Sequence, residues 1–343
     1  MLSPIEYQNI KEKHIQGRYL VTEKVDAILK NIPKEFTIDK IGFSVEKRNI
    51  KSVTIGKGNH RILMWSQMHG NESTTTKAIL DLLQFLQQDT KEVSAIKKNC
   101  TIKIIPILNP DGAYAYTRVN ANNIDLNRDA QDLSQPESVV LKKTYDSFKP
   151  DYCLNLHDQR TIFNVGNTSK PATVSFLAPA HDPERSISSS RAISMQLIVA
   201  MNKELQKKIP GQVGRYDDGF NANCVGDAFQ MLKTPTILFE SGHYPEDYDR
   251  EKTREYIFIA LLKVLNVISN NSVHNYKQTD YNNIPENSKQ FYDILILNAE
   301  ELNPALKTNT DVGILFKETL IENKLKFVPY VDKTGNLRNN FFG

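Results

Sequence analysis

Short apolar runs alternate with amphipathic stretches along the first 270 or so residues of the chain. The apolar runs have lengths typical of buried strands. The stretches between them repeat apolar residues every three or four positions, as helices facing a core do. The predicted strands are residues 61–65, 101–108, 151–156 and 236–239. The predicted helices are residues 19–32, 73–88, 136–148, 193–205 and 257–268.

This alternation of strands and helices indicates an α/β fold class. Strands separated by helices form sheets that are mostly parallel, and the crossover helices cover the faces of such sheets. We therefore predict a three-layer α/β/α arrangement around a mostly parallel mixed sheet.

The composition changes between residues 266 and 289, where Asn and Ser are frequent and aliphatic residues are scarce. Such a stretch is typical of a boundary between domains. Beyond it, further strands are predicted at residues 293–297, 311–316 and 324–331. We expect a main domain with an N-terminal helical extension, a linker and a small β-rich appendage, at residues 1–270, 271–290 and 291–343.

The charge of the chain excludes some partners. Its 343 residues carry 43 Lys and Arg and 40 Asp and Glu, so no concentrated basic field is expected and no nucleic-acid partner. No apolar stretch reaches the roughly 18 residues that span a bilayer, and no signal peptide is evident, so we expect no membrane partner and a cytoplasmic location. The three cysteines are predicted to be buried free thiols. The sequence carries no signal for an oligomeric state.

Polar side chains that can carry chemistry follow the predicted strands. His69 and Glu72 follow the first strand, His157 directly follows the third, and Glu240 directly follows the fourth. Ligands of open α/β sheets gather at the carboxyl ends of the strands. The pattern therefore predicts that two histidines and two carboxylates lie at one edge of the sheet.

Three of these residues suit a catalytic zinc ion, which commonly takes three His or carboxylate ligands and leaves one position for water. His69 and Glu72 are three residues apart in a loop with a glycine, so both can face one ion, and His157 arrives from a distant strand. For these residues alone, the alternative is a surface His69, a helix-capping Glu72 and a core His157 with satisfied hydrogen bonds.

The segment 109–130 holds further polar residues among turn-forming Asn and Gly. A planar guanidinium beside an amide, as at Arg118, Asn127 and Arg128, suits the binding of a carboxylate. The alternative is a solvated loop whose arginines pair only with Asp125 and Asp129.

The motifs H-G-N-E, N-P-D-G and D-L-N-R follow one another, with an arginine before the last and with later strands ending in His and Glu. Together they resemble the zinc carboxypeptidase family typified by carboxypeptidase A. The resemblance covers roughly residues 40–265 and leaves the β-rich appendage unexplained. It implies one zinc ion per chain, with His69, Glu72 and His157 as ligands and with Asp125 as the carboxylate that orients the first histidine.

The resemblance also implies roles around the substrate. Glu240 corresponds to the general acid/base, and Arg118 to the arginine that stabilises the developing oxyanion. Asn127 and Arg128 correspond to the pair that binds the terminal carboxylate of the substrate. Tyr216 is the nearest candidate for the family's active-site tyrosine, with a structural aromatic as the alternative.

One residue departs from the family pattern: Asp129 stands where an asparagine is usual, so we expect a negative charge near the carboxylate-binding pair. Motifs of serine hydrolases, zincins and P-loop proteins are absent. We interpret the chain as a zinc metallocarboxypeptidase that uses a zinc-activated water and Glu240 on a peptide or small amide with a free carboxylate. The alternatives are a deacylase of small N-acyl amino acids, similar to aspartoacylase and succinylglutamate desuccinylase, and a zinc-bearing protein without catalysis.

Overall fold

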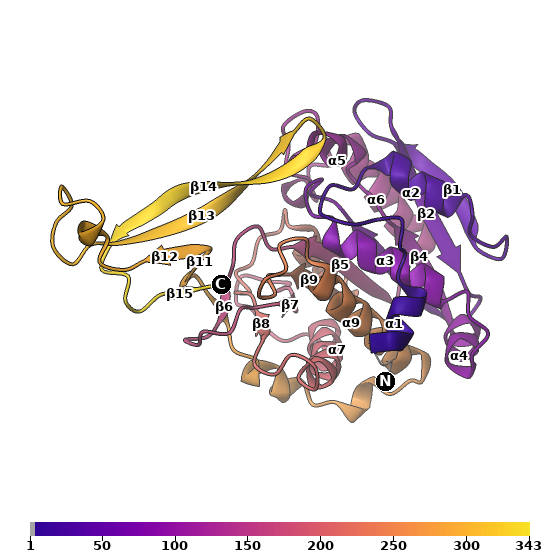
Figure 1. Ribbon diagram of the computed structural model, residues 1–343. Coiled ribbons are helices and arrows are strands. Elements are labelled where there is room, and N and C mark those ends of the chain that lie inside the picture. Colours follow the sequence, from indigo (N-terminus) through magenta and orange to yellow (C-terminus); the bar gives the residue numbers. More distant parts are fainter. Residues whose placement is uncertain (1–3) are drawn as a thin grey trace.

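The computed structural model describes residues 4–343, and an eight-stranded mixed sheet forms its centre (Figure 1). The strand order is β1-β2-β4-β3-β5-β9-β7-β8. Strands β4, β3, β5 and β9 lie side by side and are parallel, whereas β2 and β7 flank them in the antiparallel direction. The strands are β1 (Thr37–Phe43), β2 (Asn49–Ile55), β3 (His60–Ser66), β4 (Cys100–Ile105), β5 (Tyr152–Asp158), β7 (Val174–Leu177), β8 (Val213–Arg215) and β9 (Thr236–Ser241).

Helices cover both faces of this sheet. The larger core lies between the sheet and the helices α3, α4, α7 and α9, and a smaller core around Trp65 lies between the other face and α6 and α8. The predicted three-layer α/β/α fold is therefore confirmed. The helices are α1 (Pro4–Ile10), α2 (Thr22–Leu29), α3 (Thr74–Phe85), α4 (Lys91–Asn99), α5 (Pro110–Ala115), α6 (Pro136–Phe148), α7 (Ser189–Leu205), α8 (Val225–Met231) and α9 (Glu251–Ser269). Within the described residues, no helix combines the length and apolar character needed to cross a membrane.

Several elements begin or end at residues other than the predicted ones. Strand β4 ends at Ile105, because Pro106 has no N–H with which to continue the ladder. Strands β5 and β9 continue past their apolar runs, and the register pairs His157 with Glu240. These two residues thus lie within neighbouring parallel strands instead of after them.

The segment predicted as a linker packs against the main core. It forms the 3₁₀ helices η2 (Val273–Asn275) and η3 (Gln278–Asn283), and Tyr281 and Ile284 are almost completely buried in the larger core. Its short strand β10 (Asn287–Ser288) pairs with β6 (Asn164–Val165). The division of the chain into domains stays a prediction.

The C-terminal region is β-rich, as expected. A three-stranded sheet contains β12 (Ile294–Ile296), β13 (Asp311–Ile321) and β14 (Lys324–Gly335), while β11 (Phe291–Tyr292) pairs with β15 (Phe341–Phe342). A two-residue turn with positive φ at Glu322 and Asn323 joins β13 to β14, and this geometry matches the twist of a hairpin. The long hairpin, which we call the arm (residues 311–335), runs back over the main domain towards α5 (Figure 1).

Candidate metal centre and active-site cavity

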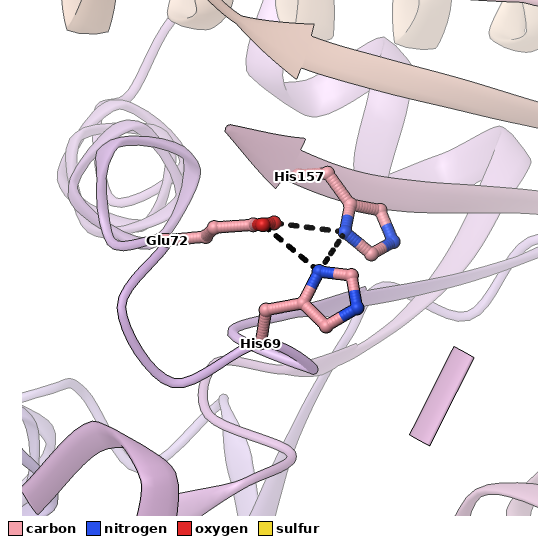
Figure 2. Close-up of side chains that lie close together, drawn as sticks. All are labelled: His69, Glu72 and His157. Carbon is pink, nitrogen blue, oxygen red and sulfur yellow. Dashed lines mark hydrogen bonds and ion pairs between the residues drawn. The ribbon is translucent and has the colours of Figure 1, made fainter. Parts of the chain in front are cut away.

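Three buried side chains meet at the carboxyl ends of β3 and β5 (Figure 2). Glu72 Oε1 lies 2.9 Å from His69 Nδ1, and Glu72 Oε2 lies 2.9 Å from His157 Nδ1. The two Nδ1 atoms are 3.1 Å apart. The three predicted ligands are therefore brought together as one cluster with two nitrogen donors and one carboxylate.

Close backbone packing explains why a glycine follows His69. A Cβ atom at Gly70 would lie 1.9 Å from the backbone carbonyl carbon of Gly112, so the H-G-N-E loop and the N-P-D-G segment can touch only with glycine at position 70. Asn109 caps α5 by accepting a hydrogen bond from the N–H of Gly112 at 2.8 Å. The two motifs thus form one packed unit beneath the cluster.

The hydrogen positions within the cluster favour a cation between its members. With its single proton on Nε2, a neutral His69 can donate to Asp125 Oδ1 at 3.0 Å and keep a lone pair on Nδ1 for an ion. Without an ion, each histidine would need a proton on Nδ1 to donate to Glu72. Two N–H groups would then face each other, with their nitrogen atoms 3.1 Å apart. With an ion, both lone pairs and the carboxylate can be directed at one point, as zinc requires. The residues therefore fit a zinc ion.

The protonation tendencies of Glu72 and His157 suit a metal site, whereas His69 is drawn towards its charged form without an ion. Burial lowers the pKa of His69, but the charge of Glu72 and the bonds to Asp125 and Glu72 outweigh it and raise the pKa. Burial raises the pKa of Glu72, but the charge of His69 and the bonds from both histidines outweigh it and hold the pKa well below its usual range. Burial lowers the pKa of His157. A carboxylate that stays ionised and a histidine that stays neutral are both ready to bind a metal. The Nε2 atom of His157 is buried without a hydrogen-bond partner among the described residues.

Arg118 and Asp125 lie beside the cluster. Arg118 Nε donates to Asp125 Oδ2 at 3.0 Å, and its NH1 lies 3.4 Å from Glu72 Oε1. Burial raises the pKa of Asp125, but His69 and Arg118 outweigh it, so the net shift is downward. The pairing of Arg118 with Asp125 that we considered as an alternative is thus present, and it directs the guanidinium at the cluster. At 42% exposure, the Arg118 side chain remains accessible to a ligand.

Eight of the nine predicted site residues line one cavity of about 460 Å³: His69, Glu72, Arg118, Asn127, Arg128, His157, Tyr216 and Glu240. Asp125 lies behind His69. A hollow of about 510 Å³ elsewhere on the described surface, beside α9, is lined by none of the predicted residues. The cavity at the cluster is therefore the candidate active site.

Glu240 lies next to His157 in this cavity, because the two residues are register partners in β9 and β5. Side chains of register partners in a parallel pair project from the same face of the sheet. Burial, followed by the negative charges of Glu72 and Asp158, raises the pKa of Glu240 well above its usual range.

Asn127 and Arg128 form another part of the cavity wall, in the 3₁₀ helix η1 (Leu126–Arg128). The side-chain oxygen of Asn127 accepts a hydrogen bond from the N–H of Val225 at 3.0 Å, which leaves its NH₂ group available. Arg128 NH1 donates to the Asn127 carbonyl oxygen at 2.7 Å and to Cys224 Sγ at 3.0 Å. Cys100 and Cys153 are buried free thiols as predicted, but Cys224 is only partly buried and lines the cavity.

Asp129, next to this pair in the chain, directs its carboxylate at local hydrogen-bond donors and not into the cavity. Its carboxylate accepts hydrogen bonds from the N–H and hydroxyl of Ser134 and from the N–H of Gln135, at 2.6 to 3.0 Å. The side chain is 2% exposed and is not among the residues that line the cavity. Local donors therefore bind the carboxylate of Asp129 outside the lining of the cavity.

Tyr216 reaches the cavity immediately after β8. Its ring packs edge-on against Phe163 at 5.5 Å between centroids, and its N–H donates to the carbonyl oxygen of Phe176. Burial and the negative charges of Glu240 and Glu72 raise the pKa of its hydroxyl. The hydroxyl therefore stays protonated and can act as a donor.

The sequence did not indicate several other cavity residues. Asn155 lies two positions before His157, and its side-chain oxygen is buried without a protein partner among the described residues. Burial raises the pKa of Asp227, another lining residue, to about 7. Arg160 lines the cavity and also contacts the arm. The two-residue spacing of Asn155 and His157 in one strand was the only usable signal, because it places both on the same face.

The fold and the cluster define an α/β protein with a candidate catalytic metal centre. A sequence model of the zinc carboxypeptidase family matches residues 21–208, over half of the chain. The chain belongs to the zinc carboxypeptidase family, and the resemblance noted from its motifs is confirmed. The match ends before Glu240 and before the arm.

Curated relatives are distant and are matched only in part. The chain is 30% identical over 115 residues to probable carboxypeptidase 2 of Arthroderma benhamiae, a match that covers 33% of this chain and 21% of the relative. It is 27% identical over 170 residues to carboxypeptidase M of Mus musculus, covering 41% of this chain and 38% of that protein. The matched segment thus spans about a fifth of the length of the fungal relative.

Solved structures share the fold. A metallo-carboxypeptidase from Burkholderia cenocepacia superposes with a TM-score of 0.60 at 15% identity, covering 73% of this chain and 69% of that one. A metallo-carboxypeptidase from Pseudomonas aeruginosa, in complex with (2-guanidinoethylmercapto)succinic acid, gives a TM-score of 0.58 at 17% identity, covering 74% of this chain and 69% of that one. At these identities the likeness establishes the fold alone.

Proposed function

We propose that the protein is a zinc-dependent carboxypeptidase that hydrolyses the C-terminal peptide bond of a peptide. The observation that carries this proposal is the position of Glu240 beside His157, in the cavity that also holds His69 and Glu72. A potential general base and a three-ligand metal site in one cavity are what metal-assisted hydrolysis requires.

His69, Glu72 and His157 would hold the metal ion. When bound, zinc polarises a carbonyl group and lowers the pKa of a water molecule towards about 7. Asp125 fixes the proton of His69 on Nε2 and so keeps Nδ1 directed at the ion.

Glu240 moves the proton in this proposal. Its carboxylate accepts a proton from the attacking water and later donates it to the amine that leaves. The raised pKa suits this role, because a carboxyl group can transfer protons efficiently near neutral pH only when its pKa approaches that pH.

Arg118 stabilises the charge that develops on the carbonyl oxygen. Its Nε is fixed by Asp125, so the guanidinium is oriented before the substrate binds. Preoriented donors of this kind commonly contribute about 10²- to 10³-fold in rate.

Asn127 and Arg128 bind the terminal carboxylate of the peptide. The amide NH₂ and the guanidinium can each donate a hydrogen bond to one carboxylate oxygen, and the bond from the N–H of Val225 holds the amide in place. The protonated hydroxyl of Tyr216 is a further donor in the same cavity.

Incubation of a mixed peptide pool with zinc-loaded protein tests the proposal, with each peptide supplied as a free acid and as a carboxyl amide. Mass spectrometry is expected to detect stepwise loss of single residues from the free acids only. Loss from both forms would refute the role of the terminal carboxylate. No loss from either, with hydrolysis of small N-acyl amino acids, would favour the deacylase alternative.

If neither kind of substrate is hydrolysed while zinc binds, a binding protein becomes the better interpretation. One zinc per chain and the cytoplasmic location remain predictions.

A further inference from the structure

The arm contacts the main domain through a buried carboxylate. Glu318 in β13 has a side chain that is only 6% exposed. One of its oxygens forms an ion pair with Arg18 NH1, and the other accepts from the hydroxyl of Tyr116 and from Arg160 NH2, the latter at 2.7 Å. Burial raises the pKa of Glu318, but Arg18, Arg160 and the nearby Arg250 outweigh it and hold the pKa below its usual value.

The partners of Glu318 hold the loop that carries two of the candidate metal ligands. Arg160 NH1 donates to the carbonyl oxygen of Asn71 at 2.9 Å, and Asn71 lies between His69 and Glu72.

The other side of this loop is held in the same way. The N–H of Asn71 donates to the carbonyl oxygen of Thr117, the residue after Tyr116, at 3.2 Å. The hydroxyl of Ser73, the residue after Glu72, donates to the carbonyl oxygen of Arg18 at 2.6 Å. Each partner of Glu318 thus supports the loop, either directly or through its neighbour in the chain.

We propose that Glu318 is a positioning residue of the metal centre, through which the C-terminal arm fixes the loop of residues 69–73. This inference rests on the metal site of the proposed function but not on the proposed reaction.

The physical reason is charge balance. Arg18, Arg160 and Arg250 lie close to one another, and without the carboxylate two of them lose their counter-ion in a largely buried place. Leaving a buried charge unpaired is costly, so the Arg160 guanidinium will turn towards water and release its bond to the carbonyl oxygen of Asn71. Movement of Arg18 will disturb the backbone carbonyl oxygen that accepts from Ser73. The loop then holds the candidate metal ligands His69 and Glu72 less firmly in position.

A second contact keeps the arm docked when Glu318 is changed. The hydroxyl of Tyr248 donates to Asp293 Oδ1 at 2.7 Å, and Asp293 Oδ2 accepts from the N–H of Phe316 in β13 at 2.6 Å. The ring of Tyr248 also packs against Phe316 and Phe327 of the arm, with centroids 5.5 and 5.2 Å away. Variants at position 318 are therefore expected to fold with the arm in place.

The test measures zinc affinity of the full chain by competition with a chromophoric chelator, in Glu318→Gln and Glu318→Ala. Residues that touch a metal ligand directly typically change affinity by about 10- to 100-fold, so a more distant residue should weaken zinc binding by about 3- to 10-fold, with Glu318→Gln affected less. Amide hydrogen exchange of residues 69–73 should become faster in both variants. Glu322→Gln, at the exposed tip of the same hairpin, is the matched control and should behave as wild type.

Wild-type zinc affinity and unchanged exchange at residues 69–73 in Glu318→Ala would overturn the proposal, even if the arm became sensitive to protease, because Glu318 would then only anchor the arm. Neither measurement needs turnover. A wild-type protein that fails to cleave peptides would therefore count against the proposed function, whereas this inference would be decided by the affinities.

Discussion

Two buried polar clusters lie along helix α3, one just before its start and one within it, and they differ in how their charges are matched. Near its start, Glu72 faces His69 and His157. Within the helix, Asp81 accepts hydrogen bonds from Arg254 Nε and NH2 at 2.7 and 2.6 Å.

The Asp81 cluster is complete within the protein. Besides Arg254, the hydroxyl of Tyr7 and the N–H of Glu12 donate to the Asp81 carboxylate, at 2.7 and 2.8 Å. Every acceptor has a donor, and the carboxylate charge has a guanidinium partner. Such a cluster ties α1 and the following segment to α3 and α9 and needs no ligand.

The Glu72 cluster differs, because two imidazole Nδ1 atoms and a carboxylate converge on one point, with the two nitrogens only 3.1 Å apart. The contrast indicates how a structural polar cluster and a metal site can be told apart. The former pairs each acceptor with a donor, whereas the latter directs acceptors at one another. The predictions below separate the two clusters by experiment.

The largest effect is expected from Glu240→Gln, which removes the proton acceptor and keeps the shape of the side chain. Turnover of a peptide should fall by about 10²- to 10⁴-fold, while zinc affinity stays close to wild type. Steady-state kinetics and chelator competition measure the two quantities. Glu246→Gln, on the exposed loop after β9, is the control. Full turnover in Glu240→Gln would remove Glu240 from the mechanism.

Arg254→Met should affect stability instead. The change leaves the buried Asp81 carboxylate without its charged partner, and breaking such a pair costs about 3–5 kcal/mol in the free energy of unfolding. Urea denaturation measures this loss. Zinc affinity of the folded protein should remain within about twofold of wild type. A fall in zinc affinity as large as the loss of stability would contradict the separation of the two clusters.

Asp125→Asn should weaken zinc binding by about 10- to 100-fold, because the side chain then no longer fixes the proton on His69 Nε2. Asp129→Asn is a matched control four residues away, since its side chain bonds to the turn at Ser134 and Gln135 and does not line the cavity. Chelator competition is expected to distinguish the two variants. Equal affinities would mean that Asp125 does not orient the ligand.

The smallest effect concerns pH. Burial raises the pKa of Glu251, but the charge of Lys77 and the bonds from Lys11 and Lys77 lower it to about 2. The pKa of Glu251 in the folded protein lies below the usual value of about 4.3. The ionised Glu251 carboxylate therefore stabilises the folded protein above about pH 4.3, and this stabilisation disappears as the pH falls towards 2.

Glu251→Gln should therefore unfold about 1–2 kcal/mol more easily at pH 6, and the difference should shrink towards zero as the pH is lowered. Urea denaturation at several pH values gives the difference. A difference in the free energy of unfolding that stays constant with pH would show that Glu251 does not stabilise the fold through its charge.

Local features of the chain predicted the centre of the fold and the core of the site. The apolar runs of β3, β5 and β9 and the periodic helices α3, α7 and α9 are visible in sequence, because their burial is continuous. The metal ligands could be predicted because the motifs that carry them resemble those of the zinc carboxypeptidase family; their position near strand ends alone left a structural alternative open.

Features that depend on distant contacts could not be predicted. The edge strand β1 is exposed over most of its length, so no apolar pattern marks it. Strand β5 reaches Asp158 because backbone pairing with β9 continues after the apolar run ends. Arg160 and Glu318 are brought together only by the folding of the arm, and Asp129 turns away because nearby N–H groups bind it.

The central claim is that the Glu72 cluster is built around one cation, and metal analysis after equilibrium dialysis tests it most directly. Wild-type protein, stripped with a chelator and dialysed against micromolar zinc, should retain one zinc per chain. His157→Ala should retain almost none, and Arg254→Met should retain as much as wild type. The account would be contradicted if wild-type protein retained no more zinc than His157→Ala.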